Sequence, residues 1–216
     1  MKYGESAFDI LYLLFAVCSG FLLLKRARTQ AEKHMGLAAL ILGLGDAFHL
    51  VPRVLNYFIS SDFTAALGIG KLVTSVTMTV FYGFMYKIWL GYYHESERKE
   101  LSRAVWGLAA FRVILCLFPQ NGWTRNDSGM LWGILRNIPF TALGILIIVL
   151  YFRRRNETRR FRLIWLYVTL SFLFYLPVAV GAGLLPILGM LMLPKTICYI
   201  LILTAFIGAV TKDEPR

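Results

Sequence analysis

Residues 36–58 read GLAALILGLGDAFHLVPRVLNYF, an apolar run that nevertheless contains an acid, a histidine and an arginine. About 20 consecutive apolar residues are enough to cross the hydrocarbon core of a bilayer as an α-helix. Ionisable side chains inside such a helix are costly and usually serve a function. The segment therefore predicts a transmembrane helix that carries part of a functional site.

The composition of the whole chain agrees with this interpretation. Its 216 residues are 58% hydrophobic and 16% charged, whereas an ordinary soluble domain has about 25% charged residues. We expect one polytopic α-helical membrane domain over 1–216. The formal net charge of +11 would suggest nucleic acid in a soluble protein. Here Lys and Arg cluster in short loops between apolar runs, where they set topology, so nucleic acid is excluded as a partner.

Apolar runs long enough to cross a membrane recur along the chain. The expected transmembrane helices cover residues 8–24, 36–58, 66–90, 101–118, 130–152, 162–183 and 186–211. Alternate connections are rich in Lys and Arg, and these are 25–33, 98–103 and 153–162. The positive-inside rule then places the N-terminus outside and the C-terminus in the cytoplasm. We expect a seven-helix, multi-pass protein of the plasma membrane.

A faint internal repeat divides these helices into two triplets. Pro52 and Lys71 in the first triplet are echoed by Pro177 and Lys195 in the second, at nearly equal separation and in the same orientation. This predicts a 3+1+3 layout with parallel repeats, which resembles the architecture of the SWEET transporters. Two triplets that share a Pro and a Lys by chance are the alternative.

One face of the 36–58 helix is a polar stripe. Its members are spaced at i, i+3, i+7 and i+10, which confines them to an arc of roughly 80°. Pro52 removes a backbone hydrogen bond and frees the carbonyl of Phe48, so we expect a kink there. The stripe consists of Asp46, His49, Arg53 and Asn56.

Other expected helices carry cations at a similar depth. Arg53 and Lys71 could reach the membrane surface by snorkelling, but Arg112 and Lys195 lie nearer the middle and favour a pocket. Asp46 is the only acid that we expect well inside a span, so the positive charge is in excess. The candidate ligand-binding residues are Asp46, His49, Arg53, Lys71, Ser75, Tyr82, Arg112, Arg136, Asn137, Lys195 and Tyr199.

The first functional hypothesis is a small transporter, or a receptor on the same plan, with an outward-facing cationic pocket. Its ligand would be an anionic or zwitterionic small molecule or a lipid headgroup, held by bidentate hydrogen bonds. Asp46 and His49 could form a proton-coupling pair, since histidine titrates near neutrality. The expected partners are this ligand and membrane lipids, with self-association into a homo-oligomer as a further expectation.

A second hypothesis is an intramembrane lipid hydrolase. The run from Gly45 to Arg53 resembles a Gly-Asp-containing helix of the bacterial YhhN family of membrane lysoplasmalogenases. This resemblance implies that Asp46 takes part in lipid hydrolysis. Apart from the resemblance, we expect His49 to act with Asp46 as an acid-base group while the Arg and Lys side chains hold a lipid phosphate. Ser75 and Ser171 are the candidate nucleophiles.

A third hypothesis is a retinal photoreceptor. Seven helices with a Lys in the last one are similar to the rhodopsin plan, which implies a Schiff base on Lys195. We otherwise expect no cofactor and no metal, because the cysteines show no CxxC motif and no His spacing typical of zinc. Cys18, Cys116 and Cys198 are interpreted as small buried hydrophobic residues.

Overall fold

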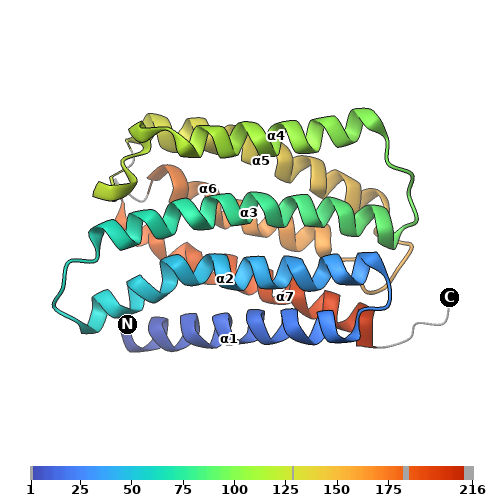
Figure 1. Ribbon diagram of the computed structural model, residues 1–216, viewed down its shortest axis with the longest axis horizontal. Coiled ribbons are helices and arrows are strands. Elements are labelled where there is room, and N and C mark those ends of the chain that lie inside the picture. Colours follow the sequence, from blue (N-terminus) through green and yellow to red (C-terminus); the bar gives the residue numbers. More distant parts are fainter. Residues whose placement is uncertain (1, 128, 182–184, 212–216) are drawn as a thin grey trace.

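The computed structural model describes residues 2–127, 129–181 and 185–211, and every regular element in these ranges is a helix. The long helices lie side by side along the long axis of the molecule (Figure 1). Their bounds are α1 Lys2–Arg26, α2 Gln30–Phe58, α3 Thr64–Tyr92, α4 Lys99–Leu117, α5 Met130–Arg153, α6 Ile164–Gly181 and α7 Met192–Thr211. Short 3-10 helices are η1 Pro119–Asn121, η2 Trp123–Arg125 and η3 Pro186–Leu191.

The chain runs back and forth between the two ends of the bundle. The N-terminus, the α2–α3 connection and η1 with η2 lie at one end, which we call the N-terminal end, and the α1–α2 connection lies at the other (Figure 1). Helix α2 packs mainly against α1 and α3, and α6 packs against α5 and α7. Helix α4 joins the two groups through α3 and α5, while α1 contacts α7. These contacts close the helices into one bundle.

Within the described ranges, six helices are long and apolar enough to cross a membrane, so the prediction of several spans is confirmed. The expected span at 101–118 is the exception. Helix α4 meets the same criterion only together with residues 119–125, and this pair is bent by 71°. Four charged residues within a 19-residue helix lower its hydropathy. The seventh crossing is thus marginal, unlike the other six.

The first helix is longer than its apolar run suggested. It begins at Lys2 rather than at residue 8, because Glu5 in its first turn suits the positive end of the helix dipole. Asp9 consequently lies inside the bundle with 4% of its surface exposed. The expectation that Asp46 is the only acid well inside a span is therefore wrong.

Two other sequence-based expectations need correction. The run 186–211 begins as the 3-10 helix η3 before α7 starts, while the last residues of the run 162–183 fall outside the described residues.

Cys116 and Cys198 are buried as expected, whereas Cys18 is exposed on the outside of α1. A cysteine on that face would contact lipid in a membrane.

Close packing of α2 and α3 positions the functional part of the bundle. Helix α2 continues through Pro52 as one element. A Cβ atom at Gly70 would collide with the carbonyl oxygen of Phe48, the group whose hydrogen bond Pro52 removes. One turn away, the Thr74 hydroxyl donates to the Gly45 carbonyl oxygen at 3.1 Å. Small residues and a backbone-bonding Thr let the two helices approach closely, as is typical of membrane bundles.

Candidate functional site

A cavity of about 310 Å³ lies between the helices near the N-terminal end of the bundle. Helices α2 to α7 all contribute side chains to its wall, together with the connection that follows η2. Its apolar lining includes Met78, Phe140 and Met192. The cavity brings together six predicted site residues, namely His49, Lys71, Ser75, Arg112, Arg136 and Lys195.

Arg112 is the most unusual side chain in this wall. It is 1% exposed, and neither its Nε nor its Nη1 has a hydrogen-bond partner. Its guanidinium carbon lies 3.2 Å from the centroid of the Phe140 ring, so a cation–π contact offsets part of the cost of burial. Buried polar atoms are normally hydrogen-bonded, because an unsatisfied one costs about 1–3 kcal/mol or more. Arg112 therefore has donors available for a ligand.

Lys195 is the second buried cation of the cavity. It is 8% exposed, and its Nζ lies 5.2 Å and 5.4 Å from the ring centroids of Tyr175 and Tyr199. No carboxylate oxygen of the described residues lies within 4 Å of this Nζ. Asp46 is close enough to attract the Lys195 charge electrostatically, but it does not form an ion pair with it. The ammonium group is thus held by aromatic rings and lacks a direct counter-charge.

Asp46 and His49 do not form the hydrogen-bonded pair that their spacing suggested. The Asp46 Oδ2 atom accepts from the Tyr12 hydroxyl at 2.7 Å, across the α1–α2 contact. The His49 Nδ1 atom is buried and has no hydrogen-bond partner. Both side chains are partly buried, but only His49 lines the cavity. The i, i+3 spacing placed them on one face and could not reveal the competing hydroxyl of α1.

Arg53, another predicted site residue, does not line this cavity. Its Nη2 atom is 3.4 Å from the Glu5 Oε2 atom, and the Tyr57 hydroxyl donates to the same oxygen at 2.9 Å. This cluster joins the beginning of α1 to the end of α2. The acids before the first apolar run were the signal that could have placed Arg53 here.

Asn137 supports the wall without lining it. Its Oδ1 atom accepts from the Tyr175 hydroxyl at 2.8 Å, and its Nδ2 atom donates to the Gly133 carbonyl oxygen at 2.7 Å. Tyr175 is thereby fixed beside Lys195. Asn137 is best described as a positioning residue for the aromatic side of the cavity.

Tyr82 and Tyr199 belong to a buried aromatic layer next to the cavity. Their hydroxyl oxygens are 3.4 Å apart. The Tyr82 ring makes edge-on contacts with Phe140 and Phe172, at centroid distances of 5.2 Å and 5.5 Å. The two tyrosines do not line the cavity themselves, but they contact it through Phe140 and Lys195, which do.

The mouth of the cavity contains residues that sequence reasoning missed. Arg136 donates from Nη1 to Asn121 Oδ1 at 2.7 Å, and its guanidinium carbon lies 4.5 Å from the Trp123 ring centroid. Asn126 and the exposed Asp127 also line the cavity. Asn and Gly in this connection indicate turns, but nothing in the sequence shows that the turns fold over the cavity.

The electrostatic character of the cavity is strongly positive. Lys71, Arg112, Arg136 and Lys195 line the cavity, and Asp127 carries the only carboxylate among the described lining residues. Lys71 and Asp127 are exposed and lie at the rim. Among the described lining residues, the buried charge therefore comes from Arg112 and Lys195, and no acid of this lining is buried with them.

Each of the two candidate nucleophiles donates to a backbone carbonyl of its own helix. The Ser75 hydroxyl donates to the Lys71 carbonyl oxygen at 2.7 Å, and the Ser171 hydroxyl donates to the Val168 carbonyl oxygen at 2.8 Å. An activated serine instead donates to a nearby base. No group of three His, Cys, Asp or Glu side chains that could hold a metal ion occurs among the residues with described positions.

Comparisons of the chain with models of protein families, with curated proteins and with solved structures find no match. The residues around the cavity are therefore the basis for assigning a function. Those residues bring several positively charged donors together beside an apolar surface.

Proposed function

We propose that this chain is a small membrane transporter or receptor that binds an anionic or zwitterionic small molecule in the cavity. The observation that carries the proposal is Arg112, a fully buried guanidinium whose Nε and Nη1 have no hydrogen-bond partner. An anionic ligand would supply both the missing acceptors and the missing negative charge. Carboxylate and phosphate groups match the planar donors of arginine best, because they accept two parallel hydrogen bonds.

The rest of the lining supports a ligand with an apolar part. Met78, Phe140 and Met192 provide an apolar surface beside the cations. The rings of Tyr175 and Phe140 meet at a centroid distance of 5.7 Å and extend this surface. Binding pockets are typically apolar with a few well-placed polar groups that fix orientation. A short-chain alkyl carboxylate or alkyl phosphate therefore fits the lining better than a bare inorganic ion.

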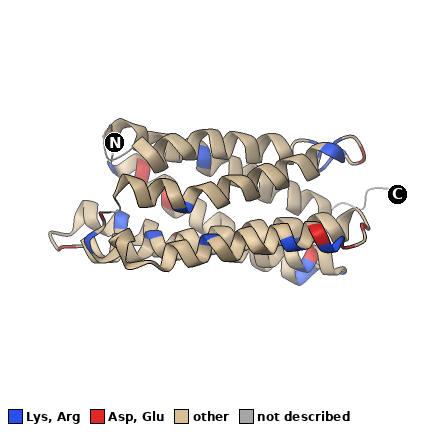
Figure 2. Cartoon of the chain, turned by 90° about the horizontal axis from the view of Figure 1, so that it is seen from above, with Lys and Arg blue, Asp and Glu red and all other residues tan. Residues whose placement is uncertain are grey.

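We further propose which end of the bundle faces the cytoplasm. Many Lys and Arg residues, drawn in blue, lie at the end opposite the N label (Figure 2). Other Lys and Arg residues lie within the helices, nearer the N label (Figure 2). The basic connections 153–162 and 25–33 belong to the former end. Under the positive-inside rule this end is cytoplasmic. The cavity then faces the outside, where it would meet ligands from the environment.

The first test measures whether Lys195 contributes to anion binding. Detergent-purified protein should gain thermal stability with octyl phosphate or octanoate and gain none with octyltrimethylammonium. Lys195→Gln should weaken the octyl phosphate response at least roughly tenfold, since a desolvated charge pair is lost. Lys87→Gln is the matched control, because Lys87 pairs with Glu97 at the other end of α3. Equal responses from both variants and the parent protein would contradict the proposal.

The second test addresses transport and its coupling to protons. His49 lines the cavity, and its buried Nδ1 has no hydrogen-bond partner, so it is the candidate coupling group. In proteoliposomes we expect uptake of octyl phosphate to accelerate when an inward proton gradient is applied. His49→Gln should remove most of that acceleration while octyl phosphate still binds. A gradient effect that persists unchanged in His49→Gln would exclude His49 as the coupling group, and binding without uptake would identify a receptor.

A further inference from the structure

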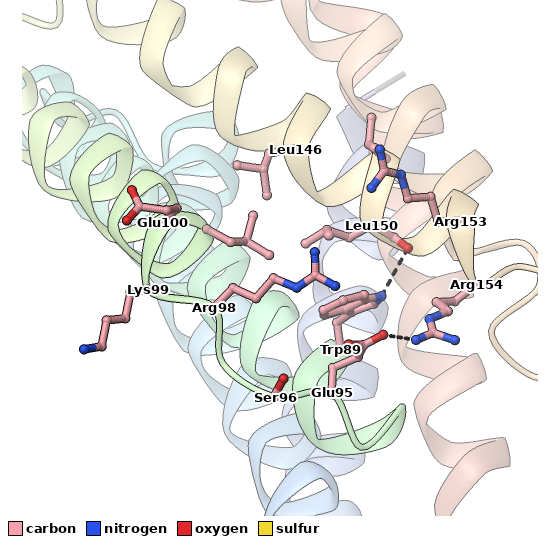
Figure 3. A pocket seen from close by; sticks show the side chains of 12 residues that line it. Trp89, Glu95, Ser96, Arg98, Lys99, Glu100, Leu146, Leu150, Arg153 and Arg154 are labelled. Atoms are coloured by element: carbon pink, nitrogen blue, oxygen red, sulfur yellow. Dashed lines mark hydrogen bonds and ion pairs between the residues drawn. The ribbon is translucent and has the colours of Figure 1, made fainter.

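A second cleft, of about 880 Å³, lies at the end of the bundle away from the N-terminus. It is formed by the end of α3, the connection to α4, the start of α4 and the last turns of α5 (Figure 3). Its floor is apolar and includes Leu101, Leu146 and Leu150. Arg98 extends from the connection across this floor towards Leu150 and Trp89 (Figure 3). A guanidinium thus reaches over an apolar surface.

Several acids lie in or near the cleft, but each is already paired. Glu95 pairs with Arg154, which also contacts Glu157. Glu100 lies 3.4 Å from Arg103, one turn further along α4. The acidic side chains of the cleft thus already form ion pairs with arginines of the protein.

The remaining cations of the cleft have no such partner. Among the residues placed in the structure, no carboxylate lies within 4 Å of the charged nitrogens of Arg98, Lys99 or Arg153. All three line the cleft. The cleft therefore has a rim with net positive charge above an apolar floor.

The cleft lies where two apolar helices end. Helix α3 ends at Tyr92 and α5 ends at Arg153, both next to the cleft. The Trp89 indole Nε1 donates to the Leu150 carbonyl oxygen at 3.1 Å, which fixes the ring at this level. Tryptophan is enriched at membrane–water interfaces. On α5, Ile145 and Val149 are 56% and 42% exposed, so the apolar floor continues onto the outer surface of the bundle.

We propose that this cleft binds one anionic phospholipid. Its phosphate would lie between Arg98 and Arg153, and one acyl chain would follow Leu146 and Val149 onto the outer face of α5. A soluble anion would use the rim and leave the apolar floor uncovered, whereas an anionic lipid matches both parts. Basic pockets beside transmembrane helices bind anionic headgroups in this way. The site is separate from the cavity, so it does not depend on the function proposed there.

The test measures lipid retention by native mass spectrometry. Full-length protein extracted from membranes of equal parts phosphatidylglycerol and phosphatidylcholine should retain one phosphatidylglycerol. Arg98→Gln/Arg153→Gln should lower that occupancy at least fivefold. Arg26→Gln/Arg159→Gln removes the same charge from exposed positions at the same end and should retain the lipid. Both double variants should elute as single peaks on size exclusion.

A second variant tests the apolar floor. Val149→Glu keeps both arginines and places a carboxylate where the acyl chain would lie, so it should also release phosphatidylglycerol. The proposal is overturned if the two double variants retain the lipid equally, or if phosphatidylcholine is retained as well as phosphatidylglycerol. It is also overturned if inorganic phosphate displaces the lipid, because the cleft would then be a site for small anions.

Discussion

Replacing Arg112 with Met is expected to raise the thermal stability of the ligand-free protein. Arg112 is 1% exposed, and its Nε and Nη1 find no acceptor, so contacts such as that with the Phe140 ring offset only part of the cost of burying its charge. Replacing a buried ion pair by apolar side chains of similar volume is often neutral or stabilises a protein by about 1–4 kcal/mol, and a buried cation without a carboxylate partner costs even more to desolvate. We expect a gain of about 1–3 kcal/mol for Arg112→Met, measured by thermal unfolding in detergent.

Arg136→Met provides the contrasting variant. Arg136 donates to Asn121 and lies over the Trp123 ring, so its removal breaks existing interactions at the mouth. We expect a loss of about 1 kcal/mol for this variant. If Arg112→Met is as destabilising as Arg136→Met, Arg112 is a structural residue whose interactions are needed without a ligand.

Replacing Gly68 with Ala is expected to destabilise the bundle and open the mouth of the cavity. A Cβ atom at this position would collide with the carbonyl oxygen of Trp123 in η2. Backbone atoms cannot rotate away as a side chain can, so η2 must move from α3. Overpacking typically costs about 1–3 kcal/mol, and Arg136 would also lose its position over Trp123. We expect a loss of about 2–3 kcal/mol and a weaker response to octyl phosphate.

Gly107→Ala is the matched control for this change. No atom lies within 4 Å of a Cβ built at Gly107, which is on an exposed face of α4. Alanine is favoured over glycine in a helix by about 1 kcal/mol, so this variant should be slightly stabilised. Thermal unfolding of the two variants side by side separates a steric effect from a helix-propensity effect. A tolerated Gly68→Ala would show that η2 does not pack tightly on α3.

The helices themselves could be predicted well because a bilayer demands long apolar runs. Six of the runs correspond to helices that can cross a membrane. Helix α4 could not be judged from its run alone, since its charged residues and the turn at Pro119 make it a bent and marginal span. The start of α1 was missed for a related reason. An apolar run marks only the part of a helix that lies in hydrocarbon. The helix itself can continue into the polar headgroup region, as α1 does from Lys2.

The sequence indicated the buried cations of the cavity. It did not indicate the interaction partners of other predicted site residues. Burial of Arg112 and Lys195 followed from their depth in apolar runs, and both line the cavity. The partners of Arg53 and Asp46 were not predictable, because Glu5 and Tyr12 belong to a helix whose rotation about its axis the sequence does not specify. Helical spacing indicates which residues share a face. It does not indicate which neighbouring helix the face meets.

Direct binding of an alkyl phosphate to the cavity tests the central claim. Isothermal titration of octyl phosphate should be done in the Arg98→Gln/Arg153→Gln background, so that the second cleft does not contribute. We expect one site per chain, and we expect binding to disappear when Arg112→Met is added to that background. No binding in the background, or unchanged binding after Arg112→Met, would contradict the claim that a buried, unpaired arginine makes this cavity an anion site.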